Sequence, residues 1–190
     1  MNTLELKAEL EARFGGADVL PAGRTALSGC AKEVLGMMDA YLRDGDTFRE
    51  RGDIPNALAS FAYALGWSDA ATSLGLISTP RTGFPLTSGE PGHAGEEDIR
   101  FAEKTRKYDR HLGTAMNHLR PASEEGSCLH GSAERFLLVA RVFHDHGHQC
   151  QQNGDAPEAL ASYSYGSGWL DAGVRTGLFR ISGSRELFTI

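Results

Sequence analysis

The stretch GDAPEALASYSYGSGWLDAG, residues 154–173, determines the expected fold. An earlier stretch, GDIPNALASFAYALGWSDA at residues 52–70, has the same pattern. When residues 41–77 are aligned with residues 143–179, at a constant offset of 102, 15 of the 37 positions are identical. This offset is longer than the roughly 20–50 residues of a solenoid unit. The chain therefore contains two domain-sized copies of one sequence, here called the first and second repeats.

Each repeat contains signals for the end of one helix and the start of the next. Gly52 and Gly154 suit the left-handed residue just beyond a helix end. Asp53 and Asp155 follow at once and can accept hydrogen bonds as N-caps of the next helix. A proline then lies in the first helical turn, where its missing N–H has no cost. We therefore predict a tight corner between two antiparallel helices in each repeat.

Apolar residues at steps of four and three predict the remaining helices. They indicate helices over residues 2–14, from residue 25 or 28 to 51, and over 97–119, and no stretch alternates as a strand does. The predicted fold class is all-α, with two tandem up-and-down three-helix bundles. The predicted divisions are a first bundle over residues 1–80, a Gly/Pro-rich linker over 81–96 that is mobile and open to proteases, and a second bundle over 97–190.

The composition and net charge of the chain argue against several classes of function. A net charge of −6 and a pI near 5.6 argue against nonspecific binding to nucleic acid, which needs a cationic surface. The three cysteines fit no metal-binding pattern and suggest a reduced, intracellular protein. The first residues lack the apolar core of a signal peptide, and no apolar run reaches membrane-spanning length. We expect a cytoplasmic protein with neither nucleic acid nor a membrane as partner.

The third helix of each repeat has two apolar stripes on opposite sides, which is typical of a helix packed between neighbours. One stripe contains Tyr63 and Trp67 in the first repeat, and Tyr165 and Trp169 in the second. Small residues beside the tryptophans would let two such helices approach closely. We therefore predict that the third helices pack against each other, either between the repeats or in a homodimer.

An aspartate lies on the other stripe of each third helix, at Asp69 and Asp171. A buried carboxylate is costly unless it is paired or hydrogen-bonded. One interpretation is structural: each acid ties its helix to a Lys, Arg or Tyr of the first helix, or to a helix end. The other is functional: the aspartates and tryptophans line a pocket. The candidate binding residues are Tyr63, Trp67, Asp69, Tyr165, Trp169 and Asp171.

A histidine cluster gives the candidate metal ligands. His144 and His148 are spaced i, i+4 and share a helix face, a geometry that can hold zinc. The first repeat has Leu42 and Asp46 at the equivalent positions, so the duplicated pattern does not include these ligands. No H-E-x-x-H motif is present, and no third ligand is evident at useful spacing. We favour a solvated helix face over a metal site here.

The second repeat resembles a known family. Over residues 133–179 the pattern GDxxxALASYxYxxGWLDAGVRxGLF is similar to archaeal proteins of the family called domain of unknown function 357. The resemblance covers about residues 98–180 and is degenerate over 2–78. It implies an up-and-down three-helix bundle. The family has no established activity, so the resemblance implies no catalytic residue, ligand or cofactor.

Two function hypotheses follow from the sequence. The first is a non-enzymatic interaction or scaffold module that binds a protein partner or itself, since no catalytic constellation and no cofactor motif is present. The second is a metal- or small-ligand-binding protein, with or without hydrolytic activity, that uses Asp69 and Asp171 or His144 and His148. Metal analysis and a ligand screen distinguish them.

Overall fold

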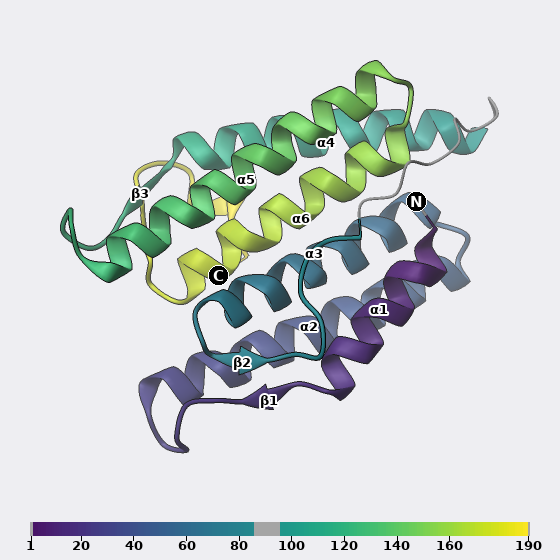
Figure 1. Ribbon diagram of the computed structural model, residues 1–190. Coiled ribbons are helices and arrows are strands. Elements are labelled where there is room, and N and C mark those ends of the chain that lie inside the picture. The colour runs from purple at the N-terminus through teal and green to yellow at the C-terminus, as the bar shows by residue number, and fades with distance from the viewer. Residues whose placement is uncertain (1, 86–95, 190) are drawn as a thin grey trace.

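The computed structural model describes residues 2–85 and 96–189. Figure 1 shows that helices make up most of the molecule, and the strands of the described residues form two small pairs. The prediction of an all-α protein is confirmed. The first repeat contains α1 (Thr3–Gly15), β1 (Asp18–Val19), α2 (Ala26–Glu50), α3 (Ile54–Ser73) and β2 (Ile77–Ser78). The second repeat contains α4 (Glu96–Asn117), β3 (Leu119–Pro121), α5 (Cys128–Gln152), α6 (Ala156–Arg175), β4 (Phe179–Ile181) and a single 3₁₀ turn (Arg185–Leu187).

The predicted corners form at the predicted residues. Gly52 and Gly154 have φ values of 71° and 81°, the left-handed region that favours glycine. The Asp53 carboxylate accepts a hydrogen bond from the amide of Asn56, and Asp155 accepts one of 3.0 Å from the amide of Glu158. These caps satisfy amides that the helix itself leaves without partners. Local chemistry therefore determines where α3 and α6 begin.

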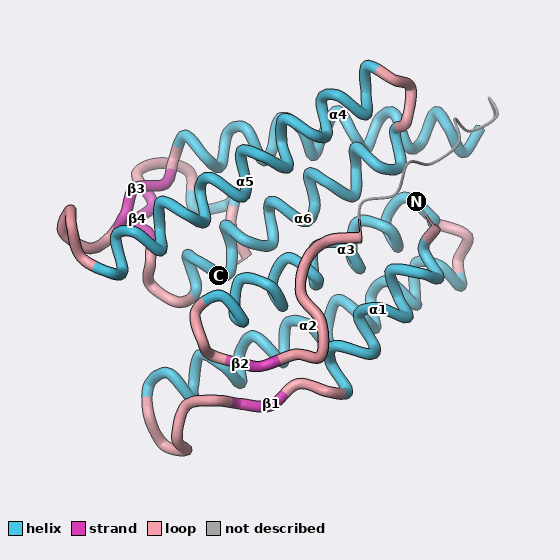
Figure 2. The backbone as a smooth tube through the Cα atoms, viewed as in Figure 1, coloured by secondary structure: helices cyan, strands magenta, loops and turns pink. Residues whose placement is uncertain are grey.

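The two strand pairs were not predicted, because strands of two or three residues are too short to show alternation. Each pair is antiparallel and joins the segment after the first helix to the segment after the third (Figure 2). Val19 is paired with Ile77, and Pro121 is paired with Phe179. Both members of the second pair lie 102 residues after those of the first. Because β1 follows α1 and β3 follows α4, the same offset of 102 residues makes α1 the equivalent of α4.

Helices α3 and α6 lie side by side at the centre of the molecule and share a more extensive contact than any other helix pair described (Figure 1). Gly66 and Gly168 face each other at this contact. A Cβ on Gly66 would collide with the carbonyl oxygen of Tyr165, and one on Gly168 would collide with the carbonyl oxygen of Tyr63. The prediction that the third helices pack between the repeats is confirmed, and the contact lies within one chain.

The two central helices, α3 and α6, are buried on all sides by each other and by the four outer helices. Every residue of α6 from Glu158 to Gly173 is buried, and so is almost all of α3. Helices α1 and α2 cover α3, while α4 and α5 cover α6. The buried apolar residues of both repeats form one continuous core. The duplicated units are therefore not independent in packing, because each provides part of the other's core.

A left-handed glycine follows the end of α6. Helix α6 ends at Arg175, and Gly177, with φ of 79°, lies just beyond it. Phe179 belongs to β4. In the predicted linker, Gly83 and Phe84 contact the rest of the protein, whereas residues 86–95 lie outside the described residues. Among the described helices, none has the length and hydrophobicity needed to cross a bilayer.

Candidate functional sites

Each of the two buried aspartates accepts a hydrogen bond from a tyrosine of the other repeat. The Tyr63 hydroxyl donates a hydrogen bond to Oδ2 of Asp171, and the Tyr165 hydroxyl donates one of 2.6 Å to Oδ2 of Asp69. Each acid therefore receives its tyrosine from the opposite central helix. The structural interpretation expected a Lys, Arg or Tyr of the first helix as the partner. Asp69 has such a partner in Arg13 on α1, but both tyrosines come from the opposite third helix.

Asp69 lies in a closed, fully paired cluster. Its Oδ1 is 2.8 Å from Nη1 of Arg13 on α1, and its Oδ2 accepts a hydrogen bond of 3.1 Å from the amide of Gly83. Arg13 is itself buried, with 1% exposure, and also contacts Oε1 of Glu9 at 2.9 Å. Phe84 covers the cluster by packing on the ring of Tyr165 at 4.7 Å between centroids. This arrangement satisfies the buried charge of Asp69.

Asp171 occupies the equivalent position but has a different environment. The residue equivalent to Arg13 on α4 is Ala115, which provides no charge. Within the described part of the chain, the recorded partners of the Asp171 carboxylate are Tyr63 and Thr189. Burial raises the pKa of Asp171 to about 6, and the bonds from Tyr63 and Thr189 offset only part of this rise. The second repeat thus contains a buried acid without the guanidinium that accompanies the first.

A pocket of about 240 Å³ opens beside Asp171, between the two repeats. Burial lowers the pKa of His111 in its wall and raises the pKa of the Tyr63 and Tyr108 hydroxyls. At neutral pH the imidazole and both phenols are therefore uncharged. The lining residues come from both repeats and from the C-terminal segment: Tyr41, Ala59, Ser60, Tyr63, Lys107, Tyr108, His111, Ser167, Asp171, Glu186, Leu187, Phe188 and Thr189.

The structure separates the sequence-predicted binding residues into three groups. Tyr63 and Asp171 line the pocket. Asp69 and Tyr165 belong to the closed cluster. Trp67 and Trp169 are core residues, with 0% and 7% exposure, and they do not line this pocket. The other pocket residues were missed, because they lie on separate helices and share no local motif.

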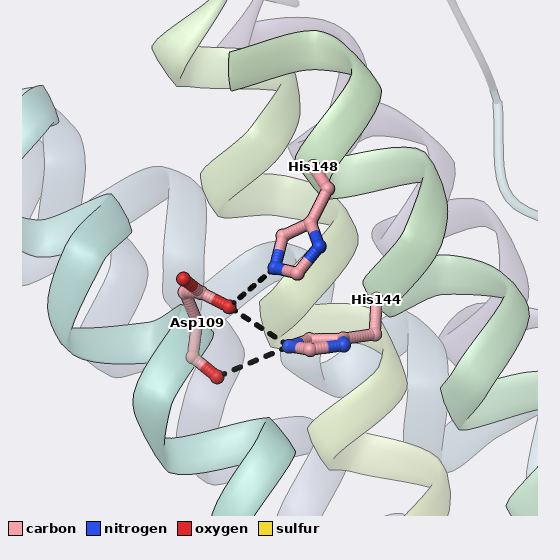
Figure 3. A group of neighbouring side chains, drawn as sticks. All are labelled: Asp109, His144 and His148. Carbon is pink, nitrogen blue, oxygen red and sulfur yellow. Dashed lines mark hydrogen bonds and ion pairs between the residues drawn. The ribbon is translucent and has the colours of Figure 1, made fainter. Parts of the chain in front are cut away.

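The histidine cluster acquires a third member in the structure. His144 and His148 on α5 both direct Nε2 toward Oδ1 of Asp109 on α4, each at 2.8 Å (Figure 3). His144 Nε2 is also 3.3 Å from the backbone carbonyl oxygen of Asp109. The sequence-based statement that no third ligand is evident is therefore corrected. Asp109 precedes His144 by 35 residues, and only the packing of α4 on α5 places them together.

The first repeat fills the equivalent place with an ordinary ion pair. Lys7 on α1 is equivalent to Asp109, Asp46 on α2 is equivalent to His148, and Lys7 Nζ lies 2.6 Å from Oδ1 of Asp46. The place of His144 is taken by Leu42, which cannot ligate a metal. At both of these places, beside the buried aspartate and between the first two helices, the first repeat has a salt bridge. The second repeat has a pocket or a cluster of donors.

Comparison with known proteins identifies the family. The profile described as "Protein of unknown function (DUF357)" matches the chain twice, over residues 8–77 and 107–179. No curated protein and no solved structure matches the chain. The two matches together cover well over half of the sequence and agree with the duplication seen in sequence, strand register and central packing. The chain therefore belongs to the domain of unknown function 357 family and carries two copies of that domain in tandem.

Proposed function

We propose that the protein is a non-enzymatic binding module whose ligand is a small organic cation, an amine or a guanidinium compound, held beside Asp171. The observation that carries this proposal is the difference between the two aspartates. In the first repeat the acid is neutralised by the Arg13 guanidinium. In the second repeat the arginine is replaced by Ala115, and a pocket lies next to the acid.

The repeat relation indicates where the cation would lie. In the first repeat, Glu9, Asp69 and Gly83 contact the Arg13 guanidinium. The equivalents of Glu9 and Asp69 are His111 and Asp171, and both line the pocket. Two groups that contact the arginine in the first repeat therefore have equivalents in the pocket wall, although Ala115 itself does not line the pocket.

Charge and shape in the pocket agree with a cationic ligand. Asp171 and Glu186 contribute two carboxylates and Lys107 one ammonium, while burial keeps His111 neutral at pH 7. Tyr41, Tyr63 and Tyr108 bring aromatic rings, whose faces attract cations. Pockets for drug-sized molecules span about 300–1,000 Å³, so a volume of about 240 Å³ suits a smaller molecule.

Ligand-induced stabilisation tests this proposal. The full chain is titrated with methylguanidine and butylamine, and methylurea serves as the neutral analogue of methylguanidine. We expect the cations, but not methylurea, to raise the melting temperature, because binding to the folded state adds RT ln(1 + [L]/Kd) of stability. Asp171→Asn should abolish the shift. Asp109→Asn, outside the pocket, should keep it. Equal shifts with methylurea, or an undiminished shift in Asp171→Asn, would refute the proposal.

A second candidate function is protein interaction or self-association on the outer surface. The small-residue faces of α3 and α6 are buried within the chain, so a partner or a homodimer would need another surface. Leu138 and Val142, one turn apart on α5, are 58% and 54% exposed. Sedimentation of the wild type and of the Leu138→Glu/Val142→Glu variant tests this candidate for self-association. A wild-type dimer that the variant disrupts would support it, and a wild-type monomer would reject self-association there.

A further inference from the structure

We infer that Asp109, His144 and His148 form a binding site for a divalent transition-metal ion, distinct from the pocket beside Asp171. Two imidazole nitrogens and one carboxylate oxygen converge here from two helices (Figure 3). All three ligand atoms lie within 4.8 Å of one another.

The spacing of the donors is close to that of a metal site. Bonds of about 2.0–2.2 Å to one ion place neighbouring ligand atoms roughly 2.9–3.5 Å apart. The two nitrogen–oxygen separations are each 2.8 Å. A shift of a few tenths of an ångström would therefore admit an ion. Side-chain rotation at a partly exposed surface can supply that shift.

The first repeat shows that joining the two helices does not require this donor set. Lys7 and Asp46 hold α1 to α2 with one ion pair at the equivalent place. The second repeat replaces the lysine by a carboxylate and adds the imidazole of His144 where the first repeat has Leu42. Each change converts a group that cannot bind a cation into one that can.

The surroundings hold the imidazoles in place. His144 and His148 pack on each other at 4.3 Å between ring centroids, and the Tyr163 ring lies 5.5 and 5.9 Å from them. Tyr163 reaches this position because Gly147 has no side chain; a Cβ there would collide with the tyrosine ring. The Tyr163 hydroxyl donates a hydrogen bond of 2.7 Å to Oε1 of Gln151, which fixes the ring.

The site is also reachable from solvent. The side chains of His144, Asp109 and His148 are 16%, 28% and 44% exposed, so an ion can enter and water can complete its coordination. In the metal-free protein each Nε2 can donate its proton to the carboxylate. When an ion binds, the tautomer with its proton on Nδ1 presents the Nε2 lone pair instead.

The donor chemistry selects the class of ion. Imidazole with carboxylate suits Zn²⁺, Co²⁺, Ni²⁺ and related ions, whereas Mg²⁺ and Ca²⁺ prefer sites made wholly of oxygen. We therefore expect Zn²⁺ and Co²⁺ to bind and Mg²⁺ not to compete with them.

The experiment measures metal binding to the untagged full chain after treatment with a chelator and removal of that chelator. Zn²⁺ binding is followed by titration calorimetry, and Co²⁺ binding by its visible absorption bands. We expect one ion per chain. Asp109→Asn, His144→Gln and His148→Gln should each weaken binding at least about tenfold, and the double histidine variant should abolish it.

His130→Gln is the matched control. His130 lies on the same helix and its Nε2 is 3.6 Å from Oε1 of Glu134. In the described part of the chain no third metal-ligating side chain joins this pair, so loss of His130 should leave metal binding unchanged. Asp171→Asn should also leave it unchanged, which separates this inference from the proposed organic-cation pocket. If the wild type takes up no ion at submillimolar Zn²⁺, or if the double histidine variant binds as the wild type does, the inference is wrong.

Discussion

The same substitution, aspartate to asparagine, should have opposite effects at the equivalent positions 69 and 171. Asp69→Asn leaves the Arg13 guanidinium buried without its carboxylate. Breaking a buried ion pair by removing one partner typically costs about 3–5 kcal/mol. Glu9 and the Gly83 carbonyl oxygen still contact Arg13, so we expect a loss at the lower end, about 3 kcal/mol.

Asp171→Asn removes a charge that has no cationic partner among residues 2–85 and 96–189. The pKa of Asp171 is raised from 3.8 to about 6 by burial. Each pKa unit corresponds to about 1.4 kcal/mol, so at pH 7 the ionised carboxylate costs the folded state roughly 3 kcal/mol. Asparagine can still accept from Tyr63, and its amide can donate to Thr189. We therefore expect no loss of stability at pH 7 and a gain of up to about 3 kcal/mol.

The pH dependence of folding stability follows from the upward shift of the Asp171 pKa. A folded-state pKa above the unfolded value means that the folded protein binds more protons between about pH 4 and pH 6. The wild type should therefore lose stability relative to Asp171→Asn as the pH rises through this window. Below pH 4 the acid is protonated in both states, and the difference should vanish.

Urea unfolding measures these quantities. The fluorescence of the buried Trp67 and Trp169 reports unfolding, and midpoints are compared at pH 4, 5, 6 and 7 for the wild type and both variants. If Asp171→Asn were destabilised at pH 7 by as much as Asp69→Asn, the asserted difference between the two sites would be wrong. A stability difference between Asp171→Asn and the wild type that did not change with pH would also contradict this reasoning.

Further predictions concern the central contact, the pocket and a helix cap. Gly168→Ala should lower the free energy of unfolding by about 1–3 kcal/mol, because its Cβ meets the Tyr63 carbonyl oxygen. Gly29→Ala, in open space on α2, should raise that free energy by roughly 0.5–1 kcal/mol in the same urea assay. Ala115→Arg should copy the first repeat, so calorimetry should show lost methylguanidine binding, and unaltered binding would contradict the assignment of the pocket. Asp155→Ala should lower stability by about 1 kcal/mol through loss of the α6 N-cap, measured by thermal unfolding.

Local signals in the sequence determined the helices and their corners. The left-handed glycines, the aspartate caps and the prolines act through backbone groups a few residues away, so they can be recognised without tertiary structure. The two apolar stripes of the third helices likewise predicted that these helices are covered on both sides. The packing of α3 on α6 confirms that prediction. The C-terminal end of α6 and the short strands were not predicted, since pairing with distant residues determines them.

The candidate sites, in contrast, were decided by tertiary structure. The sequence indicated His144 and His148, but Asp109 joins them only because α4 packs against α5. Asp69 and Asp171 have the same local motif, and nothing within that motif distinguishes them. Their environments differ because Arg13 lies on α1 where α4 has Ala115, and the two tyrosines cross between the repeats. Sequence alone predicts local structure well, because backbone caps and periodicity act over a few residues. Whether a buried acid is neutralised or left beside a pocket depends on side chains brought from distant helices, and this only the folded chain determines.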